Sequence, residues 1–256
     1  LSEAWNIVSH LDQVRNSEAL REAYNEMLPE VTAFGTKVLL DQTIWNQVKV
    51  FAGSPETQSL DDQEKRLLDE LVADFVEAGA DLPEDKRRRL EELSTELAQA
   101  TQKFSENVLD STNAWEKNIV DESLLDGLPP SAKVAARETA KQKEMDGWLF
   151  TLHAPSIMPI MKYLADSSIR KEFWKASSKI GWEGEQDNTD LIRTILELRQ
   201  EKAVLLGKKD YADVVLERRM AGSGARADEF VSDLKEKTAL AFDRENDQLI
   251  AFKAKK

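Results

Sequence analysis

The 256-residue sequence contains no cysteine, only two histidines, ten glycines and seven prolines. Without cysteine, disulfide bonds, thiolate metal sites and a cysteine nucleophile are excluded. The two histidines, His10 and His153, cannot form the zinc-binding pattern H-E-x-x-H, because they are not four positions apart. No apolar run reaches the roughly 20 residues of a membrane-spanning helix, and the first residues lack the pattern of a signal peptide. We therefore expect a cytoplasmic protein.

Basic residues are also in the minority. The 35 lysines and arginines face 48 aspartates and glutamates, so the formal net charge is −13. Such a field repels phosphate backbones and anionic membrane surfaces, and we expect neither nucleic acid nor membrane as a partner. The one basic run, from Lys86 to Arg89, has acids at helical spacing on both sides. This spacing predicts a solvated, charge-paired helix face.

The scarcity of glycine and proline, together with many good helix formers, predicts an all-α fold of long antiparallel helices. Pro29 is expected to bend the helix that begins after Ser17, and Gly53 to Pro55 to close that segment. The longest periodic stretch starts at Pro83 and runs to Trp115. Further helices are expected over residues 62–78, 131–144, 157–165, 168–180, 191–206 and 225–256.

Two short segments do not follow the helical period. Residues 115–120 alternate between polar and apolar side chains, and residues 148–152 do so less regularly. Alternation with a period of two is typical of a strand with one buried face. We expect at most one small two-stranded antiparallel ribbon, formed by Trp115 to Val120 and Trp148 to Leu152.

Few residues are candidates for chemistry. Neither His10 nor His153 has an acid three or four positions later, so we expect no metal ligand at either; His10 should lie on a helix face and His153 should make a loop hydrogen bond. Residues Gly222 to Ala227 match the letters G-x-G-x-x-A, but a helix-like segment, Val214 to Met220, precedes them instead of a strand. We expect a turn between helices, capped by Ser223 or Gly224. The residues alone assign no catalytic, cofactor-binding or metal-binding position.

Several segments resemble a known enzyme family. They are Val8 to Tyr24 with Leu28 and Pro29, Phe104 to Asp110, Gly147 to Leu152 leading to Pro155, Leu205 to Asp213, and Met220 with Ala221. In content and order these segments resemble the N-terminal helical part of the zinc metallopeptidases that include oligopeptidase A, thimet oligopeptidase, neurolysin and the bacterial dipeptidyl carboxypeptidases. The resemblance extends over essentially the whole chain.

The resemblance implies an almost wholly helical enzyme that is divided by a deep channel and hydrolyses short, unstructured peptides. One zinc ion is held in the family by the two histidines of H-E-F-G-H and a later glutamate, and the glutamate of the motif is the general base. None of these residues occurs in this chain, so the zinc of the full-length enzyme has its ligands elsewhere and this segment binds none. The segment should form one wall of the channel and be inactive alone.

The expected organisation is a helical domain over residues 1–222, and a long helix over residues 223–256 that leads towards the missing catalytic domain. The chain starts and stops within helical sequence, so we expect an excerpt of a longer protein. Partners would be short peptides, the catalytic domain of the same polypeptide and, for the isolated segment, a second copy. Apolar residues near helical spacing on the last helix favour such self-association, namely Phe230, Leu234, Ala241, Leu249 and Phe252. The alternative is a free-standing helical interaction module without enzymatic activity.

Overall fold

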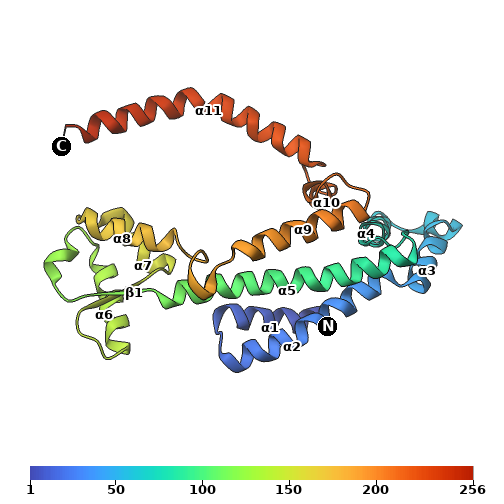
Figure 1. Ribbon diagram of the computed structural model, residues 1–256. Coiled ribbons are helices and arrows are strands. Elements are labelled where there is room, and N and C mark those ends of the chain that lie inside the picture. Colours follow the sequence, from blue (N-terminus) through green and yellow to red (C-terminus); the bar gives the residue numbers. More distant parts are fainter. Residues whose placement is uncertain (256) are drawn as a thin grey trace. The chain divides into compact units, whose positions relative to one another are not determined.

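The computed structural model describes residues 1–255 and is mostly helical (Figure 1). Its contacts divide the chain into two compact units. Unit 1 contains Leu1–Leu97 and Leu196–Lys256, and unit 2 contains Ala98–Ile195. Two helices have residues in both units, α5 (Glu84–Ala114) and α9 (Thr189–Leu205). The prediction of an all-α fold with at most one small ribbon is confirmed.

The remaining helices of unit 1 are α1 (Ser2–Val14), α2 (Glu18–Leu40), α3 (Gln42–Ala52), the short 3-10 helix η1 (Pro55–Ser59), α4 (Asp62–Ala78), α10 (Tyr211–Leu216) and α11 (Gly224–Lys253). As predicted, α2 continues through Pro29. It does not continue to Gly53, because the carboxylate of Asp41 accepts hydrogen bonds from the backbone N–H groups of Thr43 and Ile44, at 2.8 and 3.0 Å. Asp41 therefore caps a new helix, which we did not predict.

The core of unit 1 centres on the stacked rings of Trp45 and Phe75, whose centroids lie 5.3 Å apart. Helix α4 carries Phe75, and both of its ends are fixed locally. At its start, Asp61 and Glu64 form a reciprocal capping box, and at its end Gly79 adopts φ of 90°. This φ belongs to the left-handed region that glycine tolerates best, so Gly79 ends the helix as predicted.

Unit 2 contains the ribbon, β1 (Glu116–Ile119) and β2 (Trp148–Thr151). The strands pair antiparallel, with Glu116 opposite Thr151 and Ile119 opposite Trp148, which confirms the predicted pairing. Around it lie η2 (Glu122–Leu125), α6 (Pro130–Gln142), α7 (Ala154–Tyr163), α8 (Ser167–Ser177) and η3 (Gly184–Gln186). The phenyl ring of Phe173 on α8 is fully buried and meets the rings of Trp115 and Phe150 edge to face. The ribbon and α8 thus share one apolar core.

Helix α11 differs from the others because none of its described residues is buried. Phe230 is 66% exposed, and Leu234, Leu249 and Phe252 are also exposed. We expected a helical domain over residues 1–222 and a separate leading helix over residues 223–256. The residues on both sides of position 222 fall in unit 1. The different roles assigned to the two segments stay a prediction. Within residues 1–255, no helix is both long enough and apolar enough to cross a membrane.

Candidate functional site

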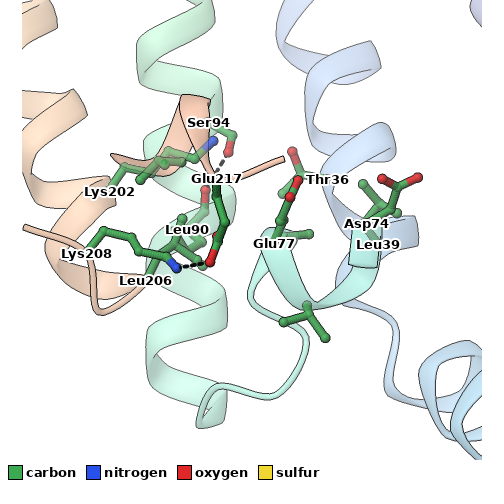
Figure 2. A pocket seen from close by; sticks show the side chains of 13 residues that line it. Thr36, Leu39, Asp74, Glu77, Leu90, Ser94, Lys202, Leu206, Lys208 and Glu217 are labelled. Atoms are coloured by element: carbon green, nitrogen blue, oxygen red, sulfur yellow. Dashed lines mark hydrogen bonds and ion pairs between the residues drawn. The ribbon is translucent and has the colours of Figure 1, made fainter. Parts of the chain in front are cut away.

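Unit 1 contains a cavity of about 420 Å³, which we call the Lys202 cavity (Figure 2). Helices α2, α4, α5 and α9 and the segment that follows α9 contribute its walls. Its apolar wall residues are Leu39, Val76, Ala78, Leu90, Leu206 and Val214, and its polar ones are Thr36, Asp74, Glu77, Ser94, Lys202, Lys208 and Glu217. The cavity therefore combines an apolar surface with charged groups of both signs.

Each carboxylate that lines this cavity is already paired with a base. The guanidinium of Arg218 donates to Asp74 at 2.5 Å and to Glu77 at 3.2 Å, and it also binds Glu70. Glu217 forms an ion pair with Lys208 (Figure 2). The hydrogen bonds that Arg218 donates to Asp74 and Glu70 raise the pKa of Arg218, and the same bond to Glu70 lowers the pKa of Glu70. Every acidic side chain that lines the cavity therefore has a basic partner.

Lys202 is the exception among the charged groups of this cavity. Helix α9 directs its side chain towards the cavity (Figure 2). Among the described residues, no hydrogen bond or ion pair involves its Nζ atom. Burial disfavours the charged ammonium, and this desolvation lowers the pKa of Lys202. Lys202 is thus a partly desolvated amine that lines the cavity and has no counter-ion among residues 1–255.

The structure places the two histidines in different units, and neither forms a metal site. His10 is exposed on α1. His153 precedes α7, and its Nε2 atom lies 2.9 Å from Oδ1 of Asn113, which confirms the predicted hydrogen bond. In the part of the chain that the structure describes, no three histidine, aspartate or glutamate side chains are grouped to hold a metal ion. The described residues therefore offer no set of side chains that fits a catalytic zinc ion.

The glycine-containing segment from Gly222 to Ala227 lies between two helices, as predicted: Gly222 and Ser223 belong to the turn, and Gly224 begins α11. Helix α10 precedes it, but this helix covers Tyr211–Leu216 and not the expected residues 214–220, because Asp210 caps it early by accepting from the N–H of Asp213. The hydroxyl of Ser223 accepts from the N–H of Arg226 and caps α11. No strand precedes the turn, so it lacks the strand–turn–helix arrangement of a dinucleotide site.

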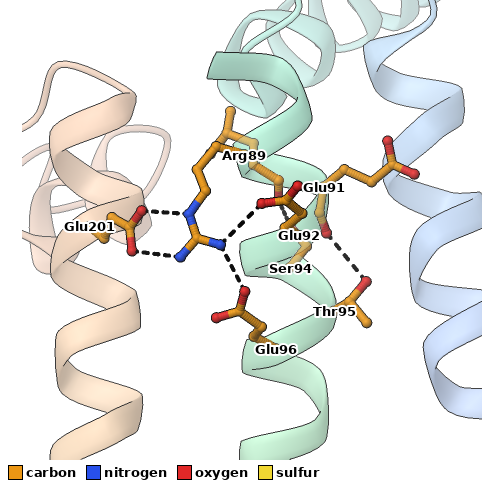
Figure 3. Close-up of polar contacts among 8 residues, drawn as sticks. Arg89, Glu91, Glu92, Ser94, Thr95, Glu96 and Glu201 are labelled. Carbon is orange, nitrogen blue, oxygen red and sulfur yellow. Dashed lines mark hydrogen bonds and ion pairs between the residues drawn. The ribbon is translucent and has the colours of Figure 1, made fainter. Parts of the chain in front are cut away.

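Arg89, in the basic run on α5, lies at the centre of a cluster of acidic side chains (Figure 3). Its Nε and Nη2 atoms donate to the two carboxylate oxygens of Glu201 at 2.7 and 2.9 Å, and its Nη1 atom donates to Glu96 at 2.7 Å and to Glu92 at 3.3 Å. The predicted charge-paired face is confirmed at Arg89. The bidentate pair with Glu201, which joins α5 to α9, was not predicted, because 112 positions separate the two residues.

We expect Arg89→Met to lower the free energy of unfolding by about 1 kcal/mol at neutral pH. The effect is modest because the side chains of Arg89 and Glu201 are 33% and 43% exposed and water screens their charges. The hydrogen bond from Arg89 lowers the pKa of Glu201 below its ordinary value of 4.5. The stabilisation is therefore complete above that value and is lost as the pH falls through the lowered pKa.

Urea unfolding of Arg89→Met and the parent chain, repeated from neutral to acidic pH, measures this effect. The neighbouring exposed residue gives a matched control, Arg88→Met, which should unfold like the parent at every pH. A difference between Arg89→Met and the parent that stayed constant into acid would show that Arg89 stabilises through packing of its aliphatic stem instead of through its charge.

Two family models match separate parts of the sequence. The model described as "Neurolysin/Thimet oligopeptidase, N-terminal domain" matches residues 1–87. The model described as "Peptidase family M3" matches residues 160–256. These ranges include α1 to α4 and the start of α5 at one end, and α8 to α11 at the other.

Individual relatives match most of the sequence. Oligopeptidase A of Salmonella typhimurium is 35% identical over 98% of this chain and 38% of its own length. Oligopeptidase A of Escherichia coli is 34% identical with the same coverage. A probable cytosolic oligopeptidase A of Arabidopsis thaliana is 36% identical over 92% of this chain and 34% of its own length. The chain thus spans less than two fifths of each of these relatives.

Proposed function

Because the chain belongs to peptidase family M3, we propose that it is the N-terminal part of a zinc-dependent oligopeptidase that hydrolyses short peptides. The observation that carries this proposal is the identity of 35% to an oligopeptidase A over 98% of the chain. The match of residues 1–87 to an N-terminal domain supports the placement at the N-terminal side of the enzyme. The names of the relatives describe peptidases that act on short chains, and we extend that activity to the protein of which this chain is part.

In this proposal the helices of residues 1–222 form one wall of the substrate channel, and the zinc ligands lie in the part of the enzyme outside this chain. The two histidines support the placement of the zinc ligands outside this chain, since His10 is exposed and the ring of His153 is hydrogen-bonded to Asn113. The Lys202 cavity has paired acids and no histidine, so it does not supply the ligands either. We assign no step of peptide hydrolysis to residues of this chain.

Helix α11 has a defined place in the proposal. Its exposed apolar side chains, such as Phe230 and Leu234, would contact the catalytic part of the same polypeptide. In the isolated chain, a second copy would take that place, against the repulsion of a net charge of −13. The acidic composition argues against nucleic acid and membrane partners. We place the protein in the cytoplasm, the compartment named for one of two Arabidopsis relatives, the other being organellar.

The reading frame of the gene tests this assignment against a free-standing interaction module. We expect it to continue beyond Lys256 and to encode an H-E-x-x-H motif with a later glutamate. A reading frame that ended without such a motif would overturn the oligopeptidase assignment and favour a helical binding module.

We further expect the chain of residues 1–256 to be inactive alone. Purified chain, supplied with zinc, should leave an internally quenched fluorescent peptide intact, because no zinc site is formed within the part of the chain that the structure describes. The product of the full reading frame, assayed beside it, is the positive control. Cleavage by the isolated chain that a chelator abolished would contradict this expectation.

A further inference from the structure

The amine of Lys202 differs from the other charged groups that line its cavity. Lys208 lines the same space, but its ammonium is paired with Glu217. The remaining acids of the wall, Asp74 and Glu77, are engaged by Arg218. Lys202 therefore faces a cavity of about 420 Å³ with an amine that no group among residues 1–255 neutralises.

We propose that Lys202 is a covalent modification site, at which small uncharged aldehydes or ketones enter the cavity and form an imine with the Nζ atom. This inference concerns the chemistry of the cavity itself and goes beyond the proposed peptidase function. Lysine side chains in apolar pockets are well suited to such chemistry, since the neutral amine, and not the ammonium, is the nucleophile.

The surroundings of the amine favour its neutral form. Apolar side chains from several elements, including Leu39, Leu90 and Leu206, form much of the wall. Burial lowers the pKa of Lys202, and desolvation is the only cause that acts on it. The charged groups that line the cavity are Asp74 and Glu77 on α4, Lys208 after α9, and Glu217 after α10; α2 and α5 add only the hydroxyl groups of Thr36 and Ser94. Because these acids are already paired, they compensate the ammonium of Lys202 only weakly.

The charges of the wall also indicate the class of compound. The three carboxylates that line the space are paired with Arg218 and Lys208, so a charged reagent would lose its hydration there without gaining a counter-ion when the amine of Lys202 is neutral. An uncharged carbonyl compound meets no such barrier, and its alkyl group can pack against the apolar wall.

The reaction balances without an oxidant, a reductant or a metal. The nitrogen lone pair attacks the carbonyl carbon and forms the C–N bond of a carbinolamine. The carbonyl oxygen then leaves as water with the two protons that the amine gives up, and a C=N double bond forms. The amine that reacts has first lost its ammonium proton to solvent, and the neutral imine that forms carries no charge that would need a counter-ion in this partly buried place.

Competition between two lysines of the same cavity tests the proposal. The chain is incubated with butanal, the imines are reduced with cyanoborohydride, and each lysine is quantified by peptide mass spectrometry over a series of pH values. At neutral pH we expect at least about twofold more label on Lys202 than on Lys208, because only Lys202 is desolvated without a partner. The labelling of Lys202 should also reach half of its maximum at a lower pH than that of Lys208. Equal or weaker labelling of Lys202 across the pH series would overturn the proposal.

Two variants test separately whether the label needs the amine of Lys202 and whether the ion pair with Glu217 protects Lys208. Lys202→Arg keeps a positive charge but has no imine-forming amine, so the label should disappear from position 202 while that on exposed lysines such as Lys175 is unchanged. Glu217→Gln removes the partner of Lys208 and should raise the label on Lys208 without lowering that on Lys202. If the Lys202→Arg variant kept the label in the peptide that contains position 202, the assignment would be contradicted. If either variant folds poorly, the comparison of Lys202 with Lys208 in the parent chain decides the question.

Discussion

Replacing Phe173 by alanine is expected to lower the free energy of unfolding of unit 2 by about 3 to 5 kcal/mol. The ring is fully buried, and it meets Trp115 at a centroid distance of 4.8 Å and Phe150 at 6.3 Å. Alanine would remove both edge-to-face contacts and leave a cavity in a core that cannot collapse without moving the ribbon. This is a large loss for a unit of this size, because small domains are only marginally stable.

Hydrogen exchange measured by mass spectrometry locates this loss. Amides in β2 and α8 should exchange much faster in Phe173→Ala, since opening of the unit becomes less costly. The adjacent residue is a matched control, because Trp174 is 56% exposed and Trp174→Ala removes a large ring without emptying the core. If the two variants raised exchange in β2 equally, the core of unit 2 would not be the one described.

In unit 1 the corresponding change is Trp45→Ala, for which we also expect a loss of about 3 to 5 kcal/mol. The indole is only 2% exposed, stacks on Phe75, and donates its Nε1–H to the carboxylate of Asp81 at 2.8 Å. The substitution removes the buried area and the stacking, and it takes the hydrogen-bond donor away from Asp81. Chemical unfolding followed by far-ultraviolet circular dichroism measures the change.

A second variant separates the ring from the hydrogen bond. Trp45→Phe keeps an aromatic ring against Phe75 but loses the indole N–H, and we expect this variant to lose less than Trp45→Ala, about 1 to 2 kcal/mol. Val50→Ala on the same helix is the control, since Val50 is exposed. A Trp45→Phe variant as unstable as Trp45→Ala would show that the bond to Asp81, and not the packing of the ring, dominates.

Local patterns in the sequence were sufficient to predict much of the fold. The period of two in residues 115–120 and 148–152 predicted the ribbon, because strand alternation is a pattern of near neighbours. It did not predict the burial of β2, whose three successive residues Trp148, Leu149 and Phe150 are all buried. The end of α4 at Gly79 and the start of α11 at Ser223 were predicted for the same reason, since caps are local. The break at Asp41 was missed because the apolar spacing continues from Val38 to Ile44, although an aspartate before a helical segment is a capping signal.

The candidate site depends on contacts that no local pattern contains. Arg218 binds acids on α4 that precede it by more than 140 positions, and Lys202 reaches its cavity only because α9 packs near α5. Among 48 acids, the sequence does not distinguish those that Arg218 or Lys208 neutralise. That Lys202 has no counter-ion among the described residues is likewise a property of the packed chain, so this amine could not be singled out beforehand.

Hydrolysis of peptides by the product of the complete reading frame tests the central claim most directly. The purified protein is assayed with an internally quenched short peptide and with a folded protein as substrate, and its bound metal is measured. The proposed function predicts cleavage of the peptide, no cleavage of the folded protein, about one zinc ion per chain, and loss of activity on chelation that zinc restores. A protein that contained zinc yet cleaved no short peptide, or that cleaved peptides equally well after complete removal of metal, would contradict the claim that this chain is part of a zinc oligopeptidase.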